Sequence, residues 1–130
     1  MYKRQVAICA DIEYPEVARM LALRGAELMA VPSADMEPYR AQQKANMMSR
    51  AIENNFFVAL ANTIDRRDDL EFFGGSGIAG PAGSLAWAGY SRQRLVVTQL
   101  SDVEVHRSGG FGGYLRTRRP DTYSVLLDKP

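Results

Sequence analysis

Alternating apolar and polar segments along the chain predict an α/β fold built on a parallel sheet. Short continuous apolar runs at residues 6–8, 28–31 and 56–61 are typical of strands that are buried on both faces. Between the first two runs, the segment from Pro15 to Arg24 places its apolar side chains on one helical face, and Gly25 follows as a helix terminator. Strand, helix and strand in this order form a βαβ unit with a right-handed crossover.

A second, longer helix is predicted from about Pro38 to Asn54. Its apolar residues recur at helical spacing and are Ala41, Ala45, Met48 and Ile52, with Met47 and Ala51 widening the stripe. We interpret the two methionines as packing residues rather than as an adaptable binding surface.

Charge and glycine dominate the segment that follows the third apolar run. Residues 65–69 carry alternating charges without apolar periodicity, which predicts a solvated loop. The glycine-rich residues 74–77 could suggest a phosphate-binding loop, but no lysine follows them and no helical pattern begins there. We therefore assign neither segment any chemistry.

The last third of the chain predicts a hairpin, a strand and a short helix. A turn at 80–83 separates two short apolar segments and favours a β-hairpin. Residues 95–97 predict a further strand, and the spacing of Ser101 and Glu104 is that of a capping box at the start of a helix. Residues 109–130 are expected to form a C-terminal arm that lies on its own domain or on a partner subunit.

Length and composition indicate that the 130 residues form one globular domain or part of one. Hydrophobic residues make up 46% of the chain and charged residues 24%, with a formal net charge of +1, which does not favour a nucleic-acid or membrane-surface partner. The apolar stretch at 56–61 is too short to cross a bilayer, and the stretch near the start is interrupted by Asp11. We expect a cytoplasmic protein.

A single cysteine and a single histidine exclude an internal disulfide and a Cys/His metal cluster, so no cofactor is expected. The cysteine, Cys9, ends the first apolar run, and Pro15 suits the first turn of the helix that follows. The thiol therefore lies at a strand-to-helix elbow, where open α/β sheets bind ligands. From position alone, both a nucleophile and a small buried hydrophobe remain open.

The residues around Cys9 resemble the nucleophile motif of the carbon-nitrogen hydrolases, the nitrilase superfamily. The motif is Cys-x-Asp, two residues, an aromatic residue and Pro-Glu, matched here by Cys9, Asp11, Tyr14, Pro15 and Glu16. Further segments similar to the family follow in order: 23–28, 50–54, Asn62, 75–83 and 118–123. The resemblance runs from Val6 to Tyr123 and corresponds to the C-terminal half of the family's catalytic domain.

This resemblance implies an αββα sandwich and hydrolysis of a nonpeptide C–N bond through a thioester on Cys9. The backbone N–H of Ala10 would be one oxyanion donor. The family also implies assembly into dimers or larger oligomers, and a small-molecule amide as substrate. Asp11 follows the amidase-like form of the motif, so an amide is favoured over a nitrile.

The family's general base and second oxyanion donor, a glutamate and a lysine, lie upstream of the cysteine. The eight residues before Cys9 contain Lys3 but no glutamate, and an extended strand would hold Lys3 about 20 Å from Cys9. We therefore expect a partial domain over residues 1–130 that is nearly inactive by itself and needs an upstream half. A truncated, noncatalytic interaction or assembly module of the same fold remains the alternative.

Two glutamates are candidates for substrate contact. By the resemblance, Glu13 occupies a position where carbamoylase-like members carry an arginine for a substrate carboxylate, so an acidic substrate is disfavoured. Glu13 is then either a contact for a cationic substrate or a solvated charge at the helix entry. Glu37 follows a strand end beside the expected pocket. Glu53 belongs to a motif at the far end of the long helix, where a catalytic role is disfavoured.

Overall fold

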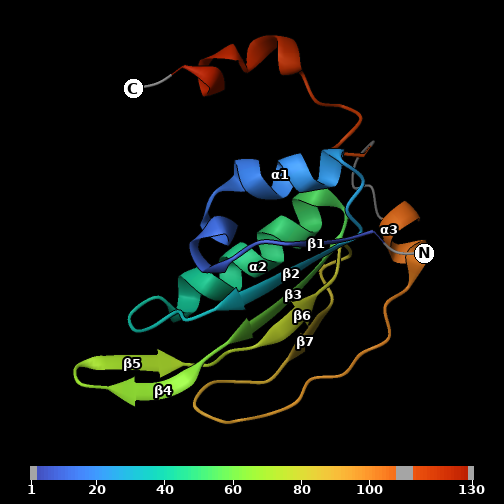
Figure 1. The fold of residues 1–130 in the computed structure, drawn as a ribbon. Coiled ribbons are helices and arrows are strands. Elements are labelled where there is room, and N and C mark those ends of the chain that lie inside the picture. The colour runs from blue at the N-terminus through green and yellow to red at the C-terminus, as the bar shows by residue number, and fades with distance from the viewer. Residues whose placement is uncertain (1–2, 108–112, 129–130) are drawn as a thin grey trace.

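One mixed sheet, covered on one face by two helices, forms the body of the molecule (Figure 1). The structure is a computed structural model and describes residues 3–107 and 113–128. Five strands form the sheet in the order β1-β2-β3-β6-β7. They are β1 (Arg4–Val6), β2 (Leu28–Ser33), β3 (Phe57–Asn62), β6 (Gly77–Ala79) and β7 (Leu85–Trp87).

The first three strands are parallel, and β6 and β7 continue the sheet in antiparallel pairing. Helix α1 (Pro15–Leu23) connects β1 to β2, and α2 (Arg40–Asn54) connects β2 to β3. This confirms the α/β class, the mixed sheet and the βαβ unit. One layer of helices on one sheet is also half of the four layers expected for an αββα sandwich.

The core lies between the helices and one face of the sheet. Alternate residues of β2 and β3 point towards the helices and are almost fully buried, namely Met29, Val31, Val58 and Leu60. The opposite face carries a row of smaller apolar residues, because Ala30, Ala59 and Ile78 are aligned across three neighbouring strands and are only half-buried. This second face has no helix layer over it in Figure 1.

The junction between β1 and α1 differs in detail from the expected strand-to-helix elbow. Strand β1 ends at Val6, two residues earlier than the apolar run, although the Ala7 N–H still donates to the Ala30 carbonyl at 3.0 Å. A 3-10 helix, η1 (Cys9–Glu13), then precedes α1, which begins at Pro15 as the proline predicts. Cys9 is therefore the first residue of η1.

Helix α2 forms as predicted, but its buried face is not the predicted stripe. Ala41, Ala45 and Ile52 are exposed, whereas Met47 and Ala51 are buried. The rest of the buried face is polar and consists of Gln43, Arg50 and Asn54. Each of the three donates to a backbone carbonyl, which offsets the cost of burying a polar side chain. Polar residues therefore share the buried face of α2 with Met47 and Ala51.

The charged segment at 65–69 is not a simple loop, and that prediction was wrong. It forms most of β4 (Ile64–Arg67) and the turn to β5 (Leu70–Phe73), in a two-stranded hairpin in which Arg67 pairs with Leu70. Asp68 and Asp69 form the two-residue turn, and Asp68 adopts a φ of 51°, which aspartate tolerates better than most residues. A hairpin exposed to solvent does not require apolar periodicity.

The glycine-rich segment makes a sharp bend between β5 and β6. Gly74 and Gly75 have φ angles of 75° and 72°, and a Cβ at Gly74 would lie 2.6 Å from the Ile64 side chain. Only glycine fits this bend without strain. The hairpin predicted after it is confirmed as β6 and β7.

The strand predicted at residues 95–97 is absent. This segment is irregular, and the side chains of Leu95 and Val97 are 86% and 81% exposed, because no strand in the described part of the chain pairs with it. The short helix after it is present as α3 (Asp102–Arg107). No helix among the described residues is long and apolar enough to cross a membrane.

The predicted arm begins outside the described residues, which resume at 113. Two short 3-10 helices follow, η2 (Pro120–Thr122) and η3 (Ser124–Leu127), and lie beyond α1 on the side away from the sheet (Figure 1). Arg118, Tyr123 and Leu126 line a pocket together with Arg19 of α1. The assignment of 109–130 as a separate arm stays a prediction.

Candidate active site

Three polar or nucleophilic residues lie at or just after the carboxyl ends of the three parallel strands. Cys9 comes after β1, Ser33 is the last residue of β2, and Asn62 is the last residue of β3. Parallel strands end at the same edge of a sheet, so these positions are brought together there. This edge is the candidate active site.

Cys9 is held in an uncommon backbone conformation. Its φ is 48°, in the left-handed region that costs a non-glycine residue free energy and that occurs often at functional sites. The side chain is half-buried. Ser33 Oγ donates to Cys9 Sγ at 3.6 Å, and Sγ in turn donates to Asp35 Oδ1 at 3.7 Å. The thiol therefore lies between a hydroxyl donor and a carboxylate acceptor.

Two polar contacts fix the turn that carries Cys9. Asp11 Oδ2 accepts a hydrogen bond from the Ile8 N–H at 2.8 Å, which closes the turn across the cysteine. From α2, the buried Arg50 side chain donates to the carbonyls of Ile12 and Glu13 at 3.0 and 2.9 Å. The end of η1 is thus anchored to α2.

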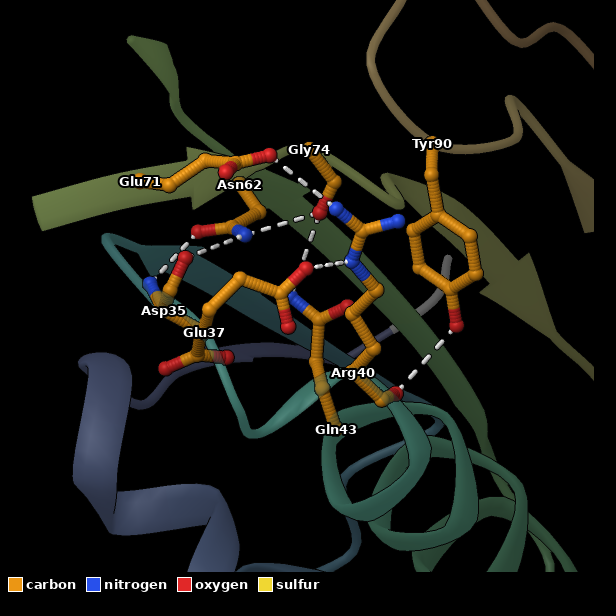
Figure 2. Close-up of polar contacts among 8 residues, drawn as sticks. All are labelled: Asp35, Glu37, Arg40, Gln43, Asn62, Glu71, Gly74 and Tyr90. Atoms are coloured by element: carbon orange, nitrogen blue, oxygen red, sulfur yellow. Dashed lines mark hydrogen bonds and ion pairs between the residues drawn. The ribbon is translucent and has the colours of Figure 1, made fainter. Parts of the chain in front are cut away.

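Asn62, at the end of β3, joins the loop after β2 to the bend between β5 and β6 (Figure 2). Its side-chain oxygen accepts the Asp35 N–H at 2.7 Å, and its amide nitrogen donates to the carbonyls of Asp35 at 3.0 Å and Gly74 at 2.7 Å. Its own N–H donates to Ser76 Oγ at 3.0 Å. Asp35 is therefore held through its backbone, which leaves its carboxylate directed by the loop towards Cys9.

Next to this loop, Arg40 forms the centre of a second cluster (Figure 2). Its guanidinium forms ion pairs with Glu37 and with Glu71, the latter at 3.2 Å. It also lies over the rings of Phe73 and Tyr90, 5.6 and 5.1 Å from their centroids. This cluster connects the start of α2 to β5.

Tyr90 is part of the same cluster. Its hydroxyl donates to the Arg40 carbonyl at 3.2 Å. Partial burial raises the pKa of Tyr90, an effect that the Arg40 charge opposes and the Glu37 charge reinforces.

The residues singled out from the sequence are not all gathered around Cys9. Ala10 is exposed and follows Cys9 in η1. Glu13 is exposed at the end of η1, and only its backbone carbonyl has a described contact, to Arg50. Glu37 is ion-paired with Arg40. Glu53 is ion-paired with Arg50 at 3.0 Å. Their functional roles stay predictions.

Sequence reasoning missed Ser33 and Asp35, the two side chains that contact the thiol. Both lie at or just after the end of the second predicted strand, at the sheet edge that also holds Cys9. That shared edge is the signal that could have identified them. Within the described residues, no group of three or more His, Cys, Asp and Glu side chains is arranged to hold a metal ion.

Comparison with known proteins places this site in context. The carbon-nitrogen hydrolase family model matches residues 2–107. A hydrolase encoded in the pqqF 5′ region of Pseudomonas protegens is 40% identical over 126 residues, which cover 96% of this chain and 44% of that protein. An (R)-stereoselective amidase of a Pseudomonas species is 41% identical over 114 residues, covering 86% of this chain and 41% of that protein.

Among solved structures, a mutant amidase from Nesterenkonia sp. AN1 superposes with a TM-score of 0.81 at 31% identity, covering 97% of this chain and 44% of that one. That structure shows covalent addition of the acetamide moiety of fluoroacetamide at the active-site cysteine. The present chain thus spans slightly less than half the length of these three similar proteins.

Proposed function

Because the chain belongs to the carbon-nitrogen hydrolase family, we propose that it carries the nucleophile of an amidase-type active site. Cys9 attacks the carbonyl carbon of a small-molecule amide, ammonia or an amine leaves, and water hydrolyses the resulting thioester. The observation that carries this proposal is the position of Cys9, which has a left-handed backbone at the sheet edge and a thiol in contact with Ser33 and Asp35.

The surrounding groups support this chemistry in different ways. The Ser33 hydroxyl donates a hydrogen bond to the sulfur and so helps to fix the position of the nucleophile. The backbone N–H of Ala10 stabilises the oxyanion of the tetrahedral intermediate. Asp11 contributes by holding the turn through the Ile8 N–H. Glu13 and Glu37 are proposed to contact substrate.

The complete site also needs residues that this sequence does not contain. By family resemblance, a glutamate takes the thiol proton and a lysine provides a further oxyanion donor, and both belong to the upstream half. Losing one such donor typically costs about 100-fold or more in rate, so the 130-residue chain by itself is proposed to be nearly inactive.

The proposal includes a cellular location and an assembly state. It works in the cytoplasm, where a single free thiol stays reduced. It assembles as a homo-oligomer of two or more copies, which is supported by apolar side chains exposed on η3, where Val125, Leu126 and Leu127 are 69%, 62% and 87% exposed.

The test joins this chain to an upstream half of the family and measures ammonia release from acetamide and from longer aliphatic amides. Cys9→Ala is expected to lower the rate by at least about 1000-fold, as loss of a nucleophile does in other hydrolases. Cys9→Ser keeps the shape of the side chain and controls for folding. Undiminished ammonia release by Cys9→Ala would contradict the proposal and would favour the noncatalytic assembly module.

A further inference from the structure

We propose that Asp35 determines substrate specificity at the Cys9 site, by selecting amides that carry a positively charged nitrogen on the carbon next to the carbonyl. This inference rests on the proposed function and names its substrate class. The simplest such substrates are α-ammonium carboxamides.

The distance between the thiol and the carboxylate sets the size of this substrate. Asp35 Oδ1 lies 3.7 Å from Cys9 Sγ. At this distance the carboxylate can reach groups that are bonded directly to the carbonyl carbon that Cys9 attacks. An α-nitrogen is separated from the carbonyl carbon by about 2.5 Å, as standard N–Cα and Cα–C bond lengths require. With the carbonyl carbon over Sγ, that nitrogen is within hydrogen-bond reach of Asp35, whereas a cation at the end of a long chain is too far from it.

The Asp35 carboxylate differs from the other acidic side chains of this region in its pairing. Glu37 and Glu71 both form ion pairs with Arg40. Within residues 3–107 and 113–128, no lysine or arginine forms an ion pair with Asp35, and the side-chain partner described for its carboxylate is the Cys9 thiol. A substrate ammonium supplies the charge-assisted hydrogen bond that this carboxylate lacks.

Asn62 makes the position of Asp35 suitable for selection. Its side chain forms hydrogen bonds with both the N–H and the carbonyl of Asp35, at 2.7 and 3.0 Å. A specificity residue must be fixed before the substrate arrives, because ordering it on binding would reduce the discrimination. Asp35→Asn also leaves both backbone hydrogen bonds in place, so this variant changes the charge without removing the clamp.

The inference is testable on the chain as it exists, because Cys9 is its single cysteine. The rate of thiol modification is measured at pH 7 with three methanethiosulfonates that carry a trimethylammonioethyl, a sulfonatoethyl or a methyl group. Each rate is divided by the rate for the same chain unfolded in urea, which removes the intrinsic reactivity of the reagent. The normalised rates then report the charge preference of the folded site.

We expect the cationic reagent to be favoured over the neutral one, and the neutral over the anionic one, by about fivefold each, the effect of two charges about 4 Å apart in water. Asp35→Asn should bring all three normalised rates close together. Asp35→Glu should retain the order, and Asp69→Asn, a loss of charge in the exposed turn between β4 and β5, should leave it unchanged. Equal preferences in the wild type and in Asp35→Asn would overturn the inference and leave Asp35 as a hydrogen-bond acceptor for the thiol.

A second measurement uses the chain joined to its upstream half and compares glycinamide with N-acetylglycinamide. We expect kcat/KM to favour glycinamide by at least about fivefold, and Asp35→Asn to remove the preference. An unchanged preference in Asp35→Asn, or none in the wild type because the upstream lysine pairs with Asp35, would overturn the inference. If neither amide is hydrolysed while the thiol still prefers the cationic reagent, the proposed function fails and the charge selectivity of Asp35 stands.

Discussion

The guanidinium of Arg50 donates to the backbone carbonyl of Ile12 at 3.0 Å and thereby ties α2 to the turn that carries Cys9. The same side chain donates to the Glu13 carbonyl and pairs with Glu53. A buried arginine in this position makes the geometry of the nucleophile depend on a residue 41 positions away in the sequence.

Replacing Arg50 should therefore destabilise the fold. Arg50→Met leaves two carbonyls without their donor, and we expect the free energy of unfolding to fall by about 3 kcal/mol. Urea denaturation followed by circular dichroism measures this loss. Arg24→Met, which removes an exposed arginine near the end of α1, is the matched control and should change stability by less than about 0.5 kcal/mol. Equal losses in the two variants would show that the anchor contributes nothing specific.

Replacing Asn62 should also destabilise the fold. Asn62→Ala removes three side-chain hydrogen bonds to the Asp35 and Gly74 backbones, and we expect a loss of about 2 to 3 kcal/mol together with a weaker charge preference at Cys9. Asn46→Ala, at a half-buried position of α2, is the control and should be neutral or slightly stabilising because alanine favours helix. If Asn62→Ala kept full stability, other contacts would have to hold the loop after β2 against the bend between β5 and β6.

The burial of Tyr90 should make the stability of the fold fall at alkaline pH. Burial raises the pKa of its hydroxyl in the folded state, so the neutral form is favoured by folding. This contribution is fully present below the ordinary tyrosine pKa of about 10 and is lost as the pH rises through the higher folded value.

The comparison with Tyr90→Phe isolates this contribution. The variant should be less stable by about 1 kcal/mol at pH 7, because the hydrogen bond to the Arg40 carbonyl is lost. The gap in unfolding free energy should narrow above about pH 10. Tyr39→Phe changes an exposed position, and its unfolding free energy should depend on pH as that of the wild type does. The same dependence in Tyr90→Phe would contradict the role given to the Tyr90 hydroxyl.

The sheet face opposite the helices, which residues 94–96 border, favours self-association of the chain. Pro32 and Ala61 are exposed beside the half-buried row of Ala30, Ala59 and Ile78, and an apolar sheet face of this kind favours contact with another surface. Sedimentation velocity should detect oligomers in the micromolar range, and Ala61→Lys should shift the distribution towards monomer. Gln42→Lys, on the exposed surface of α2, is the control. A wild-type chain that stays monomeric at all concentrations would contradict this prediction.

Much of the fold could be predicted from local patterns. The run at 28–31 and Pro15 fixed the βαβ unit, because a buried parallel strand and a helix start depend mainly on nearby residues. The buried face of α2 could not be predicted in full, since it includes the polar residues Gln43 and Arg50, which donate to the carbonyls of Gly74 and Ile12. Those partners come from distant parts of the chain.

The candidate site shows the same division. Cys9 was identified from its own motif, whereas Asp35 is recognised only when β1 and β2 are placed side by side. The prediction of a strand at residues 95–97 was wrong for a related reason. Strand propensity does not produce a strand when no neighbouring strand pairs with the segment.

The central claim is that Cys9 forms a covalent bond with the substrate. Acid quenching during turnover of an amide by the chain joined to its upstream half, followed by peptide mass spectrometry, tests this most directly. We expect an acyl group on the peptide that contains Cys9, and none on the corresponding peptide of Cys9→Ala. An acyl group on another residue, or turnover without acylation of Cys9, would contradict it.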